Sequence, residues 1–146
     1  ACMRGTVSSV QQLLQQNVDP RTTFGCYDRS YLAAAVLNKT PAVLSYLLEK
    51  RLPVDSQDTL GMTPLHVAAE GAADEFVDVL LHHNADISVL DHLGRRPFHW
   101  AVCNLNLGNT VGTLEKLLYQ KSDIHLPDEE GLTPLHIAAS HGALTA

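Results

Sequence analysis

The sequence predicts an all-α fold, a solenoid of stacked helix-turn-helix units. The first observation is a repeated motif: residues 63–69 (TPLHVAA) recur as residues 133–139 (TPLHIAA), with a degenerate copy at residues 96–102 (RPFHWAV). The second observation is the period, because His66 and His99 are 33 residues apart and His99 and His136 are 37 apart. A unit of this length cannot bury its own apolar face, so each unit must stack on its neighbours.

A turn is expected just before each copy of the motif. An aspartate and, three residues later, a glycine precede it each time, in the pairs Asp58/Gly61, Asp91/Gly94 and Asp128/Gly131. The aspartate side chain bonds to its own downstream backbone, and the glycine supplies the positive φ of a tight turn. The threonine that opens two copies is suited to the N-cap of a helix, and the proline that follows it to the first helical position.

The second half of the unit predicts another helix, over residues 75–83. Its apolar residues Phe76, Val77, Leu80 and Leu81 are spaced i, i+1, i+4, i+5, which places them on one helical face. Leucine pairs recur at residues 47–48 and 117–118 in the same phase, and residues 13–19 parallel residues 80–86. Weaker copies of the unit therefore extend toward the N-terminus.

The whole pattern resembles the ankyrin repeat. This resemblance implies a single domain over residues 1–146: a partial repeat at about 1–24, repeats at 25–57, 58–90 and 91–127, and a partial repeat at 128–146. The repeat at 91–127 carries a four-residue insertion near residues 104–109. The resemblance further implies that the segment before each motif forms a hairpin-like finger. It also implies a non-catalytic module that binds a partner protein through the tips of these fingers and through the concave face formed by the first helix of each repeat.

The histidines invite a metal hypothesis, since the chain has eight of them. The resemblance instead implies a structural role for His66, His99 and His136, in which each bonds the preceding threonine and nearby backbone. We also find no glycine-framed nucleophile, paired carboxylates or phosphate-binding glycine loop. We therefore expect no enzymatic activity, no catalytic residue, no metal site, no cofactor and no small-molecule substrate.

Apolar residues in the expected fingers are the main candidates for partner binding, because exposed apolar clusters mark interaction sites. Packing of one finger against the next is the alternative reading of the same residues. The candidate partner-binding residues, mapped by phase, are Phe24, Tyr27, Arg29, Leu60, Met62, Leu90, His92, Leu93, Arg95, Leu105 and Glu130.

The repeat at 91–127 departs from the pattern in three ways. Its insertion contains Leu105, for which neutral drift is favoured over a partner contact. Arg96 replaces the capping threonine, which costs about 1 kcal/mol. Trp100 stands where the other copies have valine or isoleucine, and packing in the core or between repeats is favoured over a binding hot spot.

Composition narrows the partner class. The net charge of −6 without a clustered basic face argues against nucleic acid, and no apolar stretch is long enough to span a bilayer. Three widely spaced cysteines favour reduced thiols and a cytoplasmic or nuclear location. We expect a monomeric module when isolated. The alternative is a regulatory or targeting segment of a larger enzyme, ion channel or transcription regulator, since the sequence starts within one repeat and stops within another.

Overall fold

The computed structural model describes residues 7–15, 25–103 and 110–141, and it confirms the all-α fold, with no strand among those residues. The helices are α1 (Val7–Gln15), α2 (Tyr31–Leu37), α3 (Pro41–Glu49), α4 (Pro64–Glu70), α5 (Asp74–His82), α6 (Pro97–Cys103), α7 (Thr110–Tyr119) and α8 (Pro134–Ser140). The expected second helix of the repeat at 58–90 is thus present as α5, shifted by one residue.

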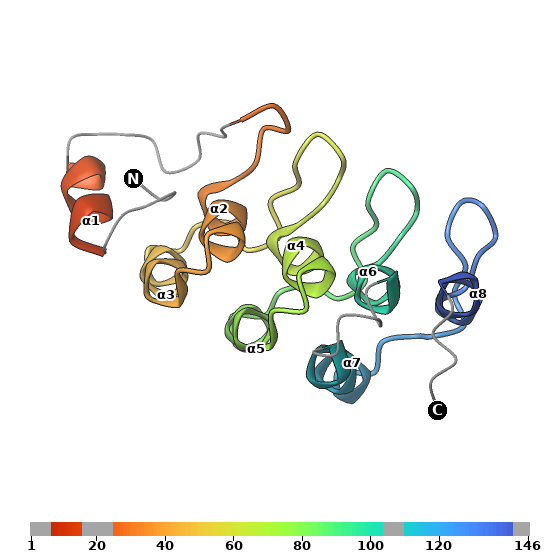
Figure 1. The fold of residues 1–146 in the computed structure, drawn as a ribbon. Helices are drawn as coiled ribbons and strands as arrows, with labels where there is room; N and C mark the ends of the chain where they lie inside the picture. Colours follow the sequence, from red (N-terminus) through yellow and green to blue (C-terminus); the bar gives the residue numbers. More distant parts are fainter. Residues whose placement is uncertain (1–6, 16–24, 104–109, 142–146) are drawn as a thin grey trace.

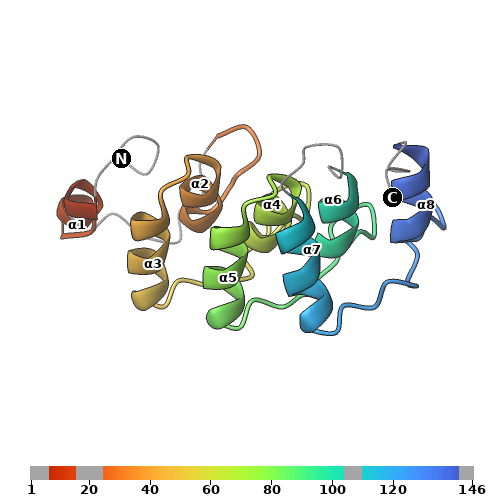
Figure 2. The same cartoon turned by 60° about the horizontal axis from the view of Figure 1, so that its bottom comes forward.

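The helices form two rows (Figure 1). We call α2, α4, α6 and α8 the inner row and α1, α3, α5 and α7 the outer row. Loops project from the N-terminal side of the inner helices and form the fingers, whereas the outer helices line the opposite side of the stack (Figures 1 and 2). Each inner helix packs against the next one, as α4 does against α2 and α6. The molecule is therefore a row of similar units, each held by its neighbours.

Leucine and alanine make the interior of this stack. Leu32 and Leu65 of the inner row and Leu44 of the outer row are fully buried. The paired alanines of the motif, such as Ala68 and Ala69, are also fully buried. Their small side chains allow neighbouring helices to approach closely, and close packing of this kind stabilises each interface in the stack.

The N-terminus of α4 shows why the Thr-Pro-Leu-His motif recurs. The Thr63 hydroxyl accepts the backbone N–H of His66, and His66 Nδ1 accepts the backbone N–H of Thr63 at 3.1 Å, which makes a reciprocal capping box. Thr133 and His136 repeat the arrangement at α8. At α6 the hydroxyl is missing, but the backbone N–H of Arg96 still donates to His99 Nδ1 at 3.2 Å. The histidine thus keeps half of the capping box in the degenerate copy.

The fingers turn as the Asp-x-x-Gly pattern predicts. Asp58 Oδ1 accepts the backbone N–H groups of Leu60 and Met62, both at 2.9 Å, and Gly61 takes a φ of +76°. A Cβ at Gly61 would lie 2.8 Å from the backbone N of His92 in the next finger. Glycine is therefore required here both for the turn and for the close approach of adjacent fingers.

Candidate finger-tip interface

One residue of each finger turn occupies an equivalent position at the tip. We call the set Tyr27, Leu60, Leu93 and Glu130 the tip row. Tyr27 and Leu60 are each 43% exposed and Leu93 is 48% exposed, which is high for large apolar side chains in an ordered turn. Glu130, with its side chain 69% exposed, replaces the apolar residue in the last described finger. The tip row is thus apolar along three fingers and acidic at its α8 end.

A single backbone hydrogen bond joins each tip to the next. The carbonyl of Tyr27 accepts the N–H of Thr59 at 2.9 Å, and the carbonyl of Leu60 accepts the N–H of His92 at 2.9 Å. The carbonyl of Leu93 accepts the N–H of Glu129 at 3.0 Å. Because the same bond recurs at the same position, the tips keep one register along the stack.

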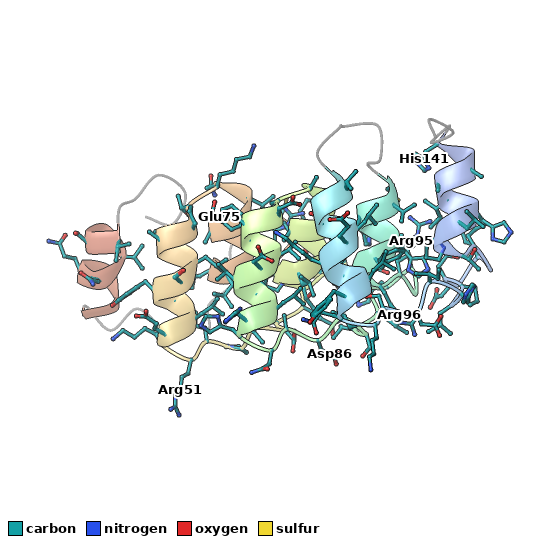
Figure 3. The ribbon with its side chains drawn as sticks, turned by 90° about the horizontal axis from the view of Figure 1, so that it is seen from below. Arg51, Glu75, Asp86, Arg95, Arg96 and His141 are labelled. Carbon is teal, nitrogen blue, oxygen red and sulfur yellow. The ribbon has the colours of Figure 1, made fainter. Side chains whose placement is uncertain are left out.

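Ion pairs to buried aspartates brace the fingers beneath their tips. Arg95 Nε donates to Asp128 Oδ2 of the next finger at 3.0 Å, and Arg29 Nε donates to Asp58 Oδ2 at 3.4 Å. Arg95 lies toward the α8 end of the stack (Figure 3). Its guanidinium stands 5.7 Å from the centroid of the Trp100 ring. Burial raises the pKa of Asp128, but the Leu132 N–H and the Arg95 guanidinium outweigh it, so the net pKa is below its usual value. Asp128 is therefore ionised, and it is held by hydrogen bonds to the backbone of its own turn and by the ion pair with Arg95.

The finger that carries Met62 lies between the fingers of Arg29 and Arg95, and the aspartate that follows it uses a different donor. Met62 occupies the position equivalent to Arg29 and Arg95 and offers no N–H to the aspartate of the next finger, Asp91. Trp100 takes over this role, since its indole Nε1 donates to Asp91 Oδ2 at 2.7 Å. The buried carboxylate is satisfied in both arrangements, as burial of a charged group requires.

Most of the predicted partner-binding residues that the structure describes are accessible. Leu90 and His92 are exposed in addition to the tip row. Phe24 and Leu105 lie outside the described residues, as does the insertion at 104–109. The exposure expected for Met62 is wrong: its side chain is only 3% exposed, because it packs inward where the equivalent arginines run toward an aspartate. Arg29 and Arg95 are half-buried and form structural ion pairs, which their predicted role in partner binding did not include.

The Trp100 bond and the two arginine–aspartate bridges are the features that sequence reasoning missed. A signal was available in the period, since arginine stands at positions 29 and 95 and methionine at 62, and the single tryptophan lies in the repeat that follows the methionine. Because Met62 cannot donate to Asp91 as Arg29 and Arg95 donate to the next aspartate, a search for another donor within the repeat of Asp91 would have found Trp100.

Two motif histidines link their inner helices, α4 and α6, to the following finger. His66 Nε2 lies 3.1 Å from the carbonyl of Arg95, and His99 Nε2 lies 3.1 Å from the carbonyl of Leu126. A carbonyl only accepts, so Nε2 carries the proton and Nδ1 is left to accept the N–H of the capping position. Both rings are fully buried, and this burial lowers the pKa of His66 and of His99 despite the bonds to carbonyls. These bonds show a structural role, and the described residues hold no group of three or more potential metal ligands.

Acidification is expected to weaken the fold through these two histidines. In the unfolded chain each takes up a proton near its ordinary pKa of about 6.5, whereas the folded state, with its lowered pKa, resists protonation. Stability is therefore complete above that pH and falls below it, until the folded pKa is reached. Thermal unfolding followed by circular dichroism should give a lower Tm at pH 5.5 than at pH 7.5. A smaller drop in a His66→Gln, His99→Gln variant would assign it to these residues, and an equal Tm at both pH values in the unaltered chain would contradict it.

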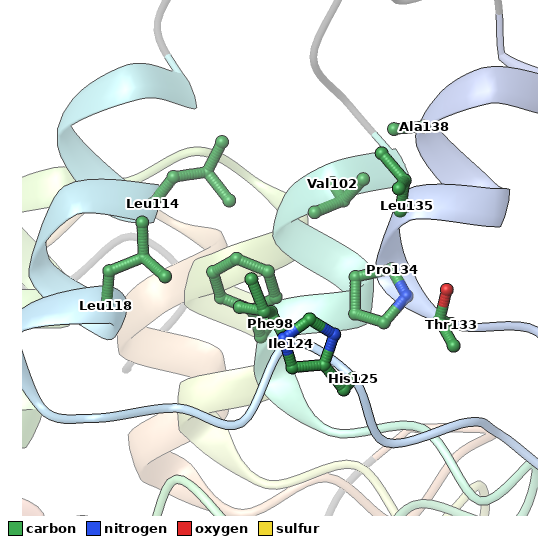
Figure 4. A pocket seen from close by; sticks show the side chains of 10 residues that line it. All are labelled: Phe98, Val102, Leu114, Leu118, Ile124, His125, Thr133, Pro134, Leu135 and Ala138. Carbon is green, nitrogen blue, oxygen red and sulfur yellow. The ribbon is translucent and has the colours of Figure 1, made fainter.

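An apolar hollow lies at the α8 end of the stack, between α6, α7 and α8 (Figure 4). It measures about 290 Å³, and its walls include Phe98, Leu114, Leu118 and Leu135. Leu135 is 77% exposed although its counterpart Leu65 is fully buried. The difference arises because α5 and α6 pack against α4, which carries Leu65, whereas no described helix follows α8.

Comparisons with known proteins match this repeated architecture. A family model described as ankyrin repeats (3 copies) matches residues 1–91 and 32–114. The chain is 33% identical over 145 residues to palmitoyltransferase AKR1 of Lachancea kluyveri, and this alignment covers 97% of this chain and 20% of that protein. Identity to inversin of Canis lupus familiaris is 34% over 118 residues, 78% of this chain and 11% of inversin. For a potassium channel of Arabidopsis thaliana it is 30% over 136 residues, 75% of this chain and 17% of the channel. The chain thus spans about a fifth or less of these relatives, and it belongs to the ankyrin-repeat family.

Proposed function

We propose that this chain is a non-catalytic protein-interaction module that binds its partner through the tip row. The observation that carries the proposal is the alignment of three exposed apolar side chains, Tyr27, Leu60 and Leu93, on adjacent fingers. Exposed apolar residues that lie together mark interaction sites. Finger-to-finger packing alone does not account for them, because each of these side chains stays more than 40% exposed in the stacked fingers.

The rigidity of the fingers supports this reading. A preorganised surface loses little conformational entropy when it binds, and affinity rises accordingly. The aspartate of the same turn accepts the backbone N–H of Leu60 and of Leu93. A backbone bond joins Tyr27, Leu60 and Leu93 each to the next finger. In the fingers of Tyr27 and Leu93 an arginine also donates to the next buried aspartate. The acidic Glu129 and Glu130 at one end favour a partner with basic residues there. The free thiols of Cys26 and Cys103 support the proposed cytoplasmic or nuclear location.

A second candidate places the module within a larger protein as a regulatory or targeting segment. The observation that favours it is the coverage of the relatives, since the matched palmitoyltransferase, inversin and potassium channel are each at least about five times longer than the matched region. We propose that the chain serves such a parent protein by holding a partner at the fingers. Sequencing of the full transcript tests this point: an open reading frame confined to these residues would contradict it.

Replacing two residues of the tip row should abolish partner binding without unfolding the chain. In Leu60→Asp, Leu93→Asp the new carboxylates would be desolvated by a partner, so affinity should fall at least about tenfold. Quantitative affinity capture from cell extract, with the amount of each retained protein compared between variants, measures the loss. Tyr119→Asp is the matched control, because Tyr119 is 86% exposed at the end of α7 in the outer row. If both variants retained the same proteins as the unaltered chain, the tip row would not be the binding surface.

A further inference from the structure

We propose that the tip row binds an amphipathic α-helix that carries a large apolar side chain at every seventh residue and a lysine or arginine one heptad beyond the third of them. This inference rests on the proposed function and names the kind of segment that the same surface would hold.

The spacing of the tips is the first argument. Packed helices lie about 8–10 Å apart, and the tips follow the spacing of the inner helices because one backbone bond fixes each finger against the next. Neighbouring tips are therefore on the order of 10 Å apart. A helix rises 1.5 Å per residue, so seven residues advance about 10.5 Å along one face. One apolar side chain per heptad thus meets one tip per finger.

The chemistry around the tips disfavours other shapes of ligand. In a β-strand, residues three apart point to opposite faces, so no regular strand matches a step of about 10 Å on one face. A polyproline helix advances about 9.3 Å per turn of three residues, but it is recognised by aromatic-lined grooves. Only Tyr27 in the tip row is aromatic, and polar residues such as Thr59 and His92 stand beside the leucines. A narrow apolar row with polar flanks matches the narrow apolar stripe of an amphipathic helix.

The charge at the α8 end of the row gives the ligand its direction. Glu130 and its neighbour Glu129 are both exposed. The Glu130 carboxylate stands 3.7 Å from Arg95 Nη2, but Arg95 is held by Asp128 at the shorter distance of 3.0 Å. Oxygens of Glu130 therefore remain accessible to a second cation. A helix lying in register would bring its fourth heptad position to Glu130, where a basic side chain complements the carboxylate.

Synthetic helices can test the spacing with the full 146-residue chain. The probe is a capped alanine–glutamine helix with leucine at one position of three successive heptads and lysine at that position in the fourth. The matched control peptide has the same composition, with the leucines shifted onto different faces of the helix. Isothermal titration calorimetry should show saturable binding of the probe, at least tenfold weaker binding of the shifted peptide, and a similar loss for Leu60→Asp, Leu93→Asp but not for Tyr119→Asp.

Reversing the charge at Glu130 tests whether the basic end of the bound helix lies at the α8 end of the tip row. Glu130→Lys should weaken binding of the probe severalfold, and a peptide with glutamate in place of the lysine should recover it. Equal binding of the probe and the shifted peptide, an unaffected Leu60→Asp, Leu93→Asp variant, or tighter binding of a polyproline peptide with leucine at every third residue would each overturn the proposal. If cellular partners are lost from the tip variant while no heptad helix binds, the proposed function stands and the helical ligand is rejected.

Discussion

Replacing His66 by alanine should lower the free energy of unfolding by about 3 kcal/mol, the combined cost of a buried cavity and unpaired polar groups. The His66 ring is fully buried and ties three groups together: the N–H and hydroxyl of Thr63 and the carbonyl of Arg95 in the next finger. Alanine would leave these groups without their partner and would open a void between α4 and the finger. Urea unfolding followed by circular dichroism measures the change.

His136 provides the matched control, because it has the same motif and the same capping box but lies exposed on the last described inner helix. His136→Ala removes only the local cap and should cost about 1 kcal/mol. A similar loss for His66→Ala and His136→Ala would show that the bond to the following finger contributes nothing measurable, contrary to the structural role described above.

Replacing Trp100 by valine should also lower the free energy of unfolding by about 3 kcal/mol, from lost packing and an unpaired buried carboxylate oxygen. Valine is the residue at the equivalent position 67, where the aspartate of the turn, Asp58, is served by Arg29 instead. In Trp100→Val no donor replaces the indole at Asp91 Oδ2, since Met62 stands in the arginine position.

A second substitution should then rescue the first. Met62→Arg together with Trp100→Val rebuilds around Asp91 the arrangement that Arg29 and Val67 make around Asp58, so most of the lost stability should return. A double-mutant cycle in urea, with the free energy of unfolding of each variant, measures this coupling. A double variant no more stable than Trp100→Val alone would contradict the exchange of donors between the two repeats.

The architecture could be predicted from the sequence because its determinants are local and repeated. The Asp-x-x-Gly turns, the threonine caps and the proline at the first helical position act within a few residues, and the structure confirms them at Asp58, Gly61 and Thr63. The exposure of Leu60 and Leu93 was also predictable, since a residue between the aspartate and glycine of a tight turn has little room to fold inward. The exposure of Tyr27 followed from its equivalent position in the repeat, although its turn has Gly25 and Asp28 where the others have aspartate and glycine. Local rules of this kind read directly from a sequence.

Contacts between repeats were decided only by the tertiary structure. Arg29 and Arg95 form ion pairs with the aspartate of the next finger, whereas Met62 at the equivalent position has no side-chain donor and is buried in the core. Identical motifs likewise diverge with their place in the stack: His66 is buried and His136 exposed, although both cap their helices in the same way. The sequence by itself determined the unit and its repetition, because these depend on backbone preferences and short-range bonds. The stacking of one unit on the next determined which of its polar groups brace the scaffold and which side chains remain available to a partner.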